Sequence, residues 1–170
     1  MADSVAEHRE HSARKRARCA VLTASDSRTP DTDTAGDAIA VALETAGHVV
    51  AERALVPDEP SRIAEQLDAW LAEEEIQVIC TTGGTGISHR DTTIEVVTAR
   101  LDKTLDGFGE IFRYLSWEEV GSAAMLSRAV GGLAGNALVF AMPGSPNAVR
   151  LAMDQLIIPE LPHLLWERQR

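Results

Sequence analysis

The sequence has few cysteines, few aromatic residues and no long apolar run. Cys19 and Cys80 are the only cysteines among 170 residues and form no CxxC pair, so neither a zinc cluster nor a disulfide framework is indicated. Each stands in a short apolar segment, where we expect a small buried side chain in a strand. No apolar stretch is long enough to cross a membrane and no signal-peptide core follows the N-terminus, so we expect a cytoplasmic protein.

Basic residues are also scarce relative to acidic ones. Lys and Arg together number 16 against 26 for Asp and Glu, which gives a formal net charge of -10. Such an excess of negative charge repels nucleic acid and anionic membranes, so we expect neither as a partner. Any phosphate ligand must therefore be held locally, by backbone amides or by a metal ion.

The alternation of apolar patterns predicts the fold class. Residues 18–25, 48–56 and 76–82 have the length and composition of strands, and each is followed by apolar residues at helical spacing. Repeated strand–helix units predict a parallel sheet that is covered on both faces. Gly135-Asn136, between two apolar runs, predicts a two-residue hairpin and hence an antiparallel pair. The expected architecture is α/β, a single three-layer α/β/α domain with a mostly parallel mixed sheet.

The N-terminal segment differs from the rest of the chain. Residues 1–17 are rich in charge and lack apolar periodicity, which predicts a disordered tail. The folded domain is expected to span residues 18–170, a length that suffices for one domain with its own core.

A glycine-rich connection, TTGGTGISHRD at residues 81–91, joins a predicted strand to a predicted helix. Ligands of such sheets lie beyond the carboxyl ends of the strands, where helix N-termini offer free N–H groups. The loop contains no lysine, and neither GxxxxGK[ST] nor GxGxxG occurs, so it is no nucleotide P-loop or dinucleotide fingerprint. Two interpretations of the loop stay open. It binds a phosphate through backbone N–H groups, or it is a tight turn without a ligand. The candidate binding residues are Thr82, Gly83, Gly84, Thr85 and Gly86.

Acidic residues stand at the ends of the predicted strands. Asp91 follows the glycine loop and also fits the capping position of the next helix. Asp58 lies in LVPDEP, where Pro-Asp is ordinary turn chemistry. The functional alternative is that Asp58 and Asp91 bind Mg²⁺, which takes oxygen ligands and bridges phosphates, and which would supply the missing positive charge. Ser25 and Asp26, at the tip of the first strand, are further candidates.

The segment MPGSP, residues 142–146, offers a second anion pocket. Gly144 permits a close approach of the backbone, Ser145 can cap the following helix and Pro146 suits the first helical position. Capping alone explains these residues. Contact with a ligand, including Pro143, is the second interpretation, because this loop is expected beside the other two.

Three segments together resemble the MoaB/MogA family of molybdenum cofactor biosynthesis proteins: TTGGTGISHRDTTIE, GFGEIFRYLSWEEVGSAAMLSRAV and FAMPGSPNAV. The similarity runs over residues 18–162, and the GFGE stretch is closest to the MoaB branch. It implies a molybdopterin-binding fold that assembles as trimers or hexamers. It also implies Mg-ATP-dependent adenylylation of molybdopterin with release of pyrophosphate.

The same resemblance assigns roles to residues. It places the two essential carboxylates at Asp58 and Asp91, and it makes Thr82–Gly86 and Pro143–Pro146 binding elements for molybdopterin and ATP. It also suggests contact with the downstream molybdenum insertase. The alternative function is a non-catalytic molybdopterin-binding or carrier protein of the same fold.

Overall fold

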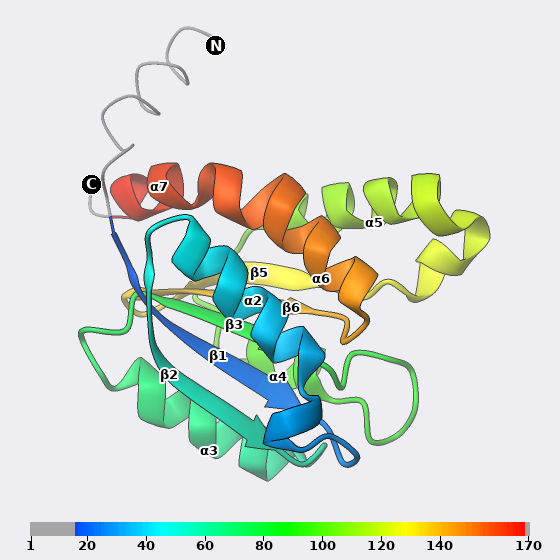
Figure 1. Ribbon diagram of the computed structural model, residues 1–170, viewed down its shortest axis with the longest axis horizontal. Helices are drawn as coiled ribbons and strands as arrows, with labels where there is room; N and C mark the ends of the chain where they lie inside the picture. Colours follow the sequence, from blue (N-terminus) through cyan, green and yellow to red (C-terminus); the bar gives the residue numbers. More distant parts are fainter. Residues whose placement is uncertain (1–15, 169–170) are drawn as a thin grey trace, which may run out of the picture.

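One mixed sheet of six strands forms the centre of the computed structural model, which describes residues 16–168 (Figure 1). The strands are β1 (Arg18–Ala24), β2 (Val49–Val56), β3 (Val78–Thr82), β4 (Lys103–Thr104), β5 (Val130–Ala134) and β6 (Ala137–Met142). Their order across the sheet is β2-β1-β3-β6-β5-β4. Strands β2, β1, β3 and β6 run parallel, whereas β5 is antiparallel to both β6 and β4. The carboxyl ends of the four parallel strands therefore meet at one edge.

Helices cover both faces of this sheet (Figure 1). The helical segments are η1 (Pro30–Thr32), α2 (Thr34–Thr45), α3 (Pro60–Leu71), α4 (Thr93–Thr98), α5 (Asp106–Val120), η2 (Gly121–Leu126), α6 (Pro146–Ala152), η3 (Met153–Ile157) and α7 (Ile158–Glu167). Helices α2, α5, α6 and α7 pack on one face, and α3 and α4 pack on the other. The predicted three-layer α/β/α architecture with a mostly parallel mixed sheet is confirmed.

Successive residues of the central strands enter opposite cores, because side chains alternate between the faces of a sheet. In β1, Cys19 and Val21 pack toward α2, while Ala20 and Leu22 pack toward α3. Both faces are buried, which explains why this strand is an unbroken apolar run. Burial raises the pKa of the Cys19 thiol to about 12, so it stays protonated, as expected of a small buried side chain.

The predicted hairpin is present. Ala134 pairs with Ala137 in the antiparallel ladder, which leaves Gly135 and Asn136 as the two-residue connection. Gly135 has φ of +53°, a value that two-residue hairpin turns require and that glycine adopts without strain.

Three features differ from the expectation. Strand β4 was not predicted, because two residues are too short to show a period. The long last helix contains a π-helical segment, η3, directly before Pro159 and Pro162, whose missing N–H groups interrupt the regular ladder. Ala17, assigned to the tail, is buried and its N–H donates to His48 Nδ1 at 3.2 Å.

The tail was expected at residues 1–17, and residues 1–15 lie outside the described residues. The described chain is packed from Ala17 onward rather than from Arg18. Within residues 16–168, none of the helices combines the length and apolar character that crossing a bilayer requires.

Burial of α2 against the sheet gives a direct test of this packing. Ile39→Ala should lower the free energy of unfolding by about 2–5 kcal/mol, because Ile39 is completely buried and its truncation leaves a cavity. Ile87→Ala is the matched control, since its side chain is 75 % exposed, and it should change that free energy by at most about 0.5 kcal/mol. Denaturant titration of both variants measures the difference. Equal losses would contradict the assigned position of α2.

Candidate functional site

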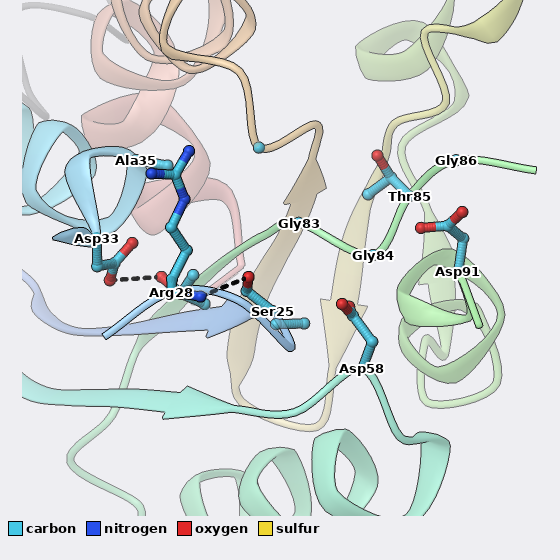
Figure 2. A pocket seen from close by; sticks show the side chains of 13 residues that line it. Ser25, Arg28, Asp33, Ala35, Asp58, Gly83, Gly84, Thr85, Gly86 and Asp91 are labelled. Carbon is cyan, nitrogen blue, oxygen red and sulfur yellow. Dashed lines mark hydrogen bonds between the residues drawn. The ribbon is translucent and has the colours of Figure 1, made fainter. Parts of the chain in front are cut away.

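A pocket of about 290 Å³ lies where the connections after β1, β2 and β3 meet the loop after β6 (Figure 2). Because these four strands are parallel neighbours, their carboxyl ends bring segments far apart in the sequence to one place. The lining residues are Thr23, Ala24, Ser25, Arg28, Asp33, Ala35, Asp58, Gly83, Gly84, Thr85, Gly86, Asp91 and Gly144.

Most of the candidate residues named from the sequence line this pocket. The structure brings together Ser25, Asp58, Gly83, Gly84, Thr85, Gly86, Asp91 and Gly144. The other candidates lie just outside the lining and have structural contacts of their own. These are Asp26, Thr82, Pro143, Ser145 and Pro146.

The MPGSP loop is joined to the glycine loop and also caps a helix. The buried Thr82 hydroxyl donates to the Pro143 carbonyl at 3.1 Å. Ser145 Oγ accepts the Ala148 N–H at 3.2 Å, and Pro146 is the first residue of α6, so the predicted capping role is confirmed. Accepting this bond leaves the hydroxyl proton of the exposed Ser145 available to another group.

The glycine loop adopts backbone conformations that only glycine takes easily. Gly83 and Gly84 have φ of +86° and +59°. A methyl carbon added at Gly83 would lie 2.2 Å from the Ala24 carbonyl oxygen, so β1 and this loop are in close contact. Among residues 16–168, no backbone carbonyl accepts the N–H groups of Gly84 and Thr85. Backbone donors are thus available at the pocket, as the phosphate interpretation requires.

Asp58 is the carboxylate whose hydrogen bonding is incomplete. Its Oδ2 accepts the Asp26 N–H at 3.2 Å, and the Asp58 N–H donates back to Asp26 Oδ1 at 3.1 Å. Its Oδ1 is buried and has no hydrogen-bond partner within the described part of the chain. Burial, together with the negative charges of Asp26 and Asp91, raises the pKa of Asp58 above its ordinary value. An additional donor or a cation beside Oδ1 would stabilise the ionised form.

Asp91 lies farther along the same glycine loop, near Gly86, in a different environment (Figure 2). Its Oδ2 accepts the Ser88 N–H at 2.9 Å. Hydrogen bonds from the Ser88 side chain and backbone, then from the Gly86 N–H, lower the pKa of Asp91, and so does the positive charge of Arg128. The capping interpretation is wrong, because the residue that precedes α4 is Thr92.

The two carboxylates contact alternate glycines of the same loop. A methyl carbon added at Gly84 would lie 2.7 Å from Asp58 Oδ1, and one added at Gly86 would lie 2.7 Å from Asp91 Oδ2. Figure 2 shows both carboxyl groups directed toward this loop. The absence of a β-carbon at these two positions therefore lets both acidic groups lie against the backbone that offers free N–H donors.

The sequence-based prediction missed a second group of pocket residues. Asp33 is buried and caps α2 by accepting the Gly36 N–H at 2.9 Å. It also accepts a hydrogen bond from the Thr23 hydroxyl at 2.8 Å. An aspartate directly before a helical pattern was the available signal for this cap. Arg28 also lines the pocket, and its Nη1 donates to the Thr32 carbonyl at 3.2 Å.

The donor set fits Mg²⁺ that arrives with a phosphate ligand. Residues 16–168 contain no group of three or more His, Cys, Asp or Glu side chains that would hold a metal alone. Mg²⁺ usually binds through one or two carboxylates plus substrate phosphates and waters, so such a group is not required. The unpartnered Oδ1 of Asp58 and the ionised Asp91 provide two carboxylates at one pocket.

Known proteins with similar sequences and structures point to one family. Residues 20–163 match the family described as "Probable molybdopterin binding domain". The chain is 49% identical over 168 residues to "Molybdenum cofactor biosynthesis protein B" of Bacillus cereus, covering 98% of this chain and 99% of the relative.

Two solved structures have the same fold. A crystal structure of molybdenum cofactor biosynthesis protein B gives a TM-score of 0.88 at 49% identity, with 92% of this chain and 98% of that chain covered. The tungsten cofactor synthesizing protein MoaB from Pyrococcus furiosus gives a TM-score of 0.83 at 35% identity, with 92% and 99% covered. These similarities span nearly the whole folded chain.

The close contact at Gly84 can be separated from its backbone conformation. Gly84→Ala and Gly135→Ala both place a side chain at positive φ, which costs roughly 1–2 kcal/mol. Only Gly84 is crowded, because nothing lies within 4 Å of a methyl group at Gly135. Gly84→Ala should therefore lower the free energy of unfolding by a further roughly 1–3 kcal/mol in denaturant titration. Equal losses for the two variants would show that Thr93 and Asp58 do not crowd this position as described.

Proposed function

This chain belongs to the molybdopterin-binding domain family of molybdenum cofactor biosynthesis proteins, and on that premise we propose that it is a molybdopterin adenylyltransferase. In the proposed reaction, a terminal phosphate oxygen of molybdopterin attacks the α-phosphorus of ATP. A new phosphorus–oxygen bond forms, the bond to the β-phosphate breaks, and pyrophosphate leaves. The products are adenylylated molybdopterin and pyrophosphate.

One observation carries this proposal. Asp58 and Asp91 both lie against a glycine loop that has free N–H donors, and all three border one pocket at the carboxyl edge of the sheet. Phosphoryl transfer needs mainly precise positioning and neutralisation of charge, rather than a nucleophile supplied by the protein. The pocket offers backbone donors and carboxylates for these two purposes, and its lining contains neither Cys nor His.

Each part of the pocket has a role in this proposal. The N–H groups of Gly84 and Thr85 bind phosphate oxygens. Ser145, with its hydroxyl proton free, orients the second ligand at the start of α6. Asp58 and Asp91 would hold Mg²⁺, which when bound neutralises part of the negative charge on the ATP phosphates. Asp26 holds the backbone N–H of Asp58 in place.

Turnover by carboxylate variants tests the enzyme assignment. Asp58→Asn and Asp91→Asn should each reduce kcat by at least about 100-fold, because each removes a negative charge that would hold Mg²⁺ against the phosphates. Asp68→Asn is the matched control, since Asp68 pairs with Arg100 outside the pocket, and it should keep wild-type turnover. The assay contains molybdopterin, ATP and Mg²⁺ and follows pyrophosphate and adenylylated product. Thermal melting of each variant checks that the fold survives.

Two results would contradict the assignment. Ordinary turnover by both carboxylate variants would remove Asp58 and Asp91 from the chemistry. Stoichiometric binding of molybdopterin by wild-type protein, without any product, would favour the non-catalytic carrier instead.

We also propose self-association as a trimer or hexamer, supported by an exposed apolar surface on α5 and η2. Its large side chains, each at least half exposed, are Ile111, Tyr114, Trp117, Val120, Met125 and Leu126. Such an accumulation of exposed large apolar side chains on one helix and the segment after it commonly marks a protein interface.

Light scattering after size-exclusion chromatography tests this assembly. Wild-type protein should elute as a trimer or hexamer, and Trp117→Glu should shift it toward monomer, because an unpaired charge is costly in an apolar interface. Val41→Glu, at a valine on α2 that is 61% exposed, serves as the control and should leave the mass unchanged. A monomeric wild-type protein at micromolar concentration would contradict the proposal.

A further inference from the structure

Arg90 connects the end of the glycine loop to the tip of β1. Its Nε donates to Asp26 Oδ2 at 2.8 Å and its Nη2 donates to Asp26 Oδ1 at 2.9 Å, which is a two-pronged guanidinium–carboxylate contact. The two residues are 64 positions apart in the sequence. Arg90 directly precedes Asp91, so this ion pair fixes one end of the loop that carries a proposed metal-binding carboxylate.

Asp26 in turn holds Asp58. The Asp26 carboxylate accepts the Asp58 N–H at 3.1 Å, and the Asp26 N–H donates to Asp58 Oδ2 at 3.2 Å. These bonds occupy one oxygen of Asp58 and leave Oδ1 facing Gly84. Arg90, Asp26 and Asp58 therefore form a chain of contacts that ties three loops together, after β3, β1 and β2 respectively.

Arg90 also offsets negative charge among these three connected residues. Asp26 and Asp58 each accept the backbone N–H of the other, which brings two negative charges near each other, and the charge of Asp26 helps to raise the pKa of Asp58. The guanidinium of Arg90 is the positive group bonded to Asp26, so it reduces that repulsion. Without it, the half-exposed Asp26 carboxylate would turn toward water, and the Asp58 N–H would lose its acceptor.

We propose that Arg90 is a positioning residue, which acts through Asp26 to hold the Asp58 carboxylate in the orientation needed for a magnesium–nucleotide ligand. This inference rests on the proposed function of the pocket. It differs from a role as a direct phosphate ligand, because Nε and Nη2 are engaged by Asp26, which orients the guanidinium toward that carboxylate and leaves mainly the Nη1 group for another ligand. In this arrangement Arg90 aligns the site, and other groups neutralise the negative charge of the phosphates.

A double-mutant cycle distinguishes positioning through Asp26 from direct contact between Arg90 and a phosphate. Arg90→Gln and Asp26→Ala should each lower kcat by about tenfold or more, because small displacements of a positioned group have large kinetic effects. The KM for molybdopterin should stay within about twofold. The variant that carries both substitutions should show no further loss, since each breaks the same chain of contacts. Arg90→Lys should restore part of the activity, because lysine keeps the charge but not the two-pronged geometry.

A binding measurement gives a readout that does not depend on turnover. Isothermal titration with Mg²⁺ and α,β-methylene-ATP should show affinity roughly tenfold weaker for Arg90→Gln and for Asp26→Ala, again without a further loss when the two are combined. Arg100→Gln is the matched control, because Arg100 makes the same two-pronged contact with Asp68, at 2.6 and 2.8 Å, outside the pocket. It should leave both kcat and affinity unchanged.

Three outcomes would overturn this role. Wild-type kinetics and affinity in Arg90→Gln would show that the ion pair is not needed. An equal effect of Arg90→Gln in the presence and absence of Asp26 would show that Arg90 contacts the nucleotide directly. An effect of Arg100→Gln of the same size would show general destabilisation. A wild-type protein that binds Mg²⁺ and the analogue without turning over ATP would refute the proposed enzyme, while the titrations would still decide the role of Arg90.

Discussion

The parallel alignment of β2, β1, β3 and β6 is the constraint on which the rest of the structure depends. Strands β1, β3 and β6 are buried on both faces, so their direction and register are fixed by two apolar cores rather than one, while the edge strand β2 is only partly buried. Parallel neighbours end at the same edge of the sheet, and four loops must therefore meet there. The segments that form the pocket, which carry the two carboxylates and the glycine loop, are far apart in the sequence. They lie together only because these strands end at the same edge.

A second constraint is the shortage of positive charge. The chain has a formal charge of -10, and its only lysines are Lys15 and Lys103, the latter at the start of β4 and absent from the pocket lining, where Arg28 is the basic residue present. Backbone N–H groups of the glycine loop partly compensate, since they bind anions without adding a side chain. The environment then distinguishes two like residues: burial raises the pKa of Asp58, while local donors lower that of Asp91.

Local patterns in the sequence were enough for the fold but only for part of the site. Apolar runs predicted the central strands, and Gly135-Asn136 predicted the hairpin, because both depend on neighbouring residues. The capping interpretation of Asp91 failed because its hydrogen bond goes to the preceding turn, which no spacing rule indicates. The contact between Arg90 and Asp26 was also missed, since 64 residues separate them and only the folded sheet brings them together.

Gly84 and the contact between Asp26 and Asp58 together determine where the Asp58 carboxylate lies. The carboxylate of Asp58 must approach a backbone that offers N–H donors, and any β-carbon at Gly84 would occupy that space. Removing the obstacle alone would leave the carboxylate free to rotate, so the bonds to Asp26 are needed to fix one of its oxygens. The remaining oxygen is then buried without a partner, which is an unfavourable state for an isolated protein. A ligand that brought a cation to this oxygen would remove that cost, as the proposed magnesium–nucleotide ligand would.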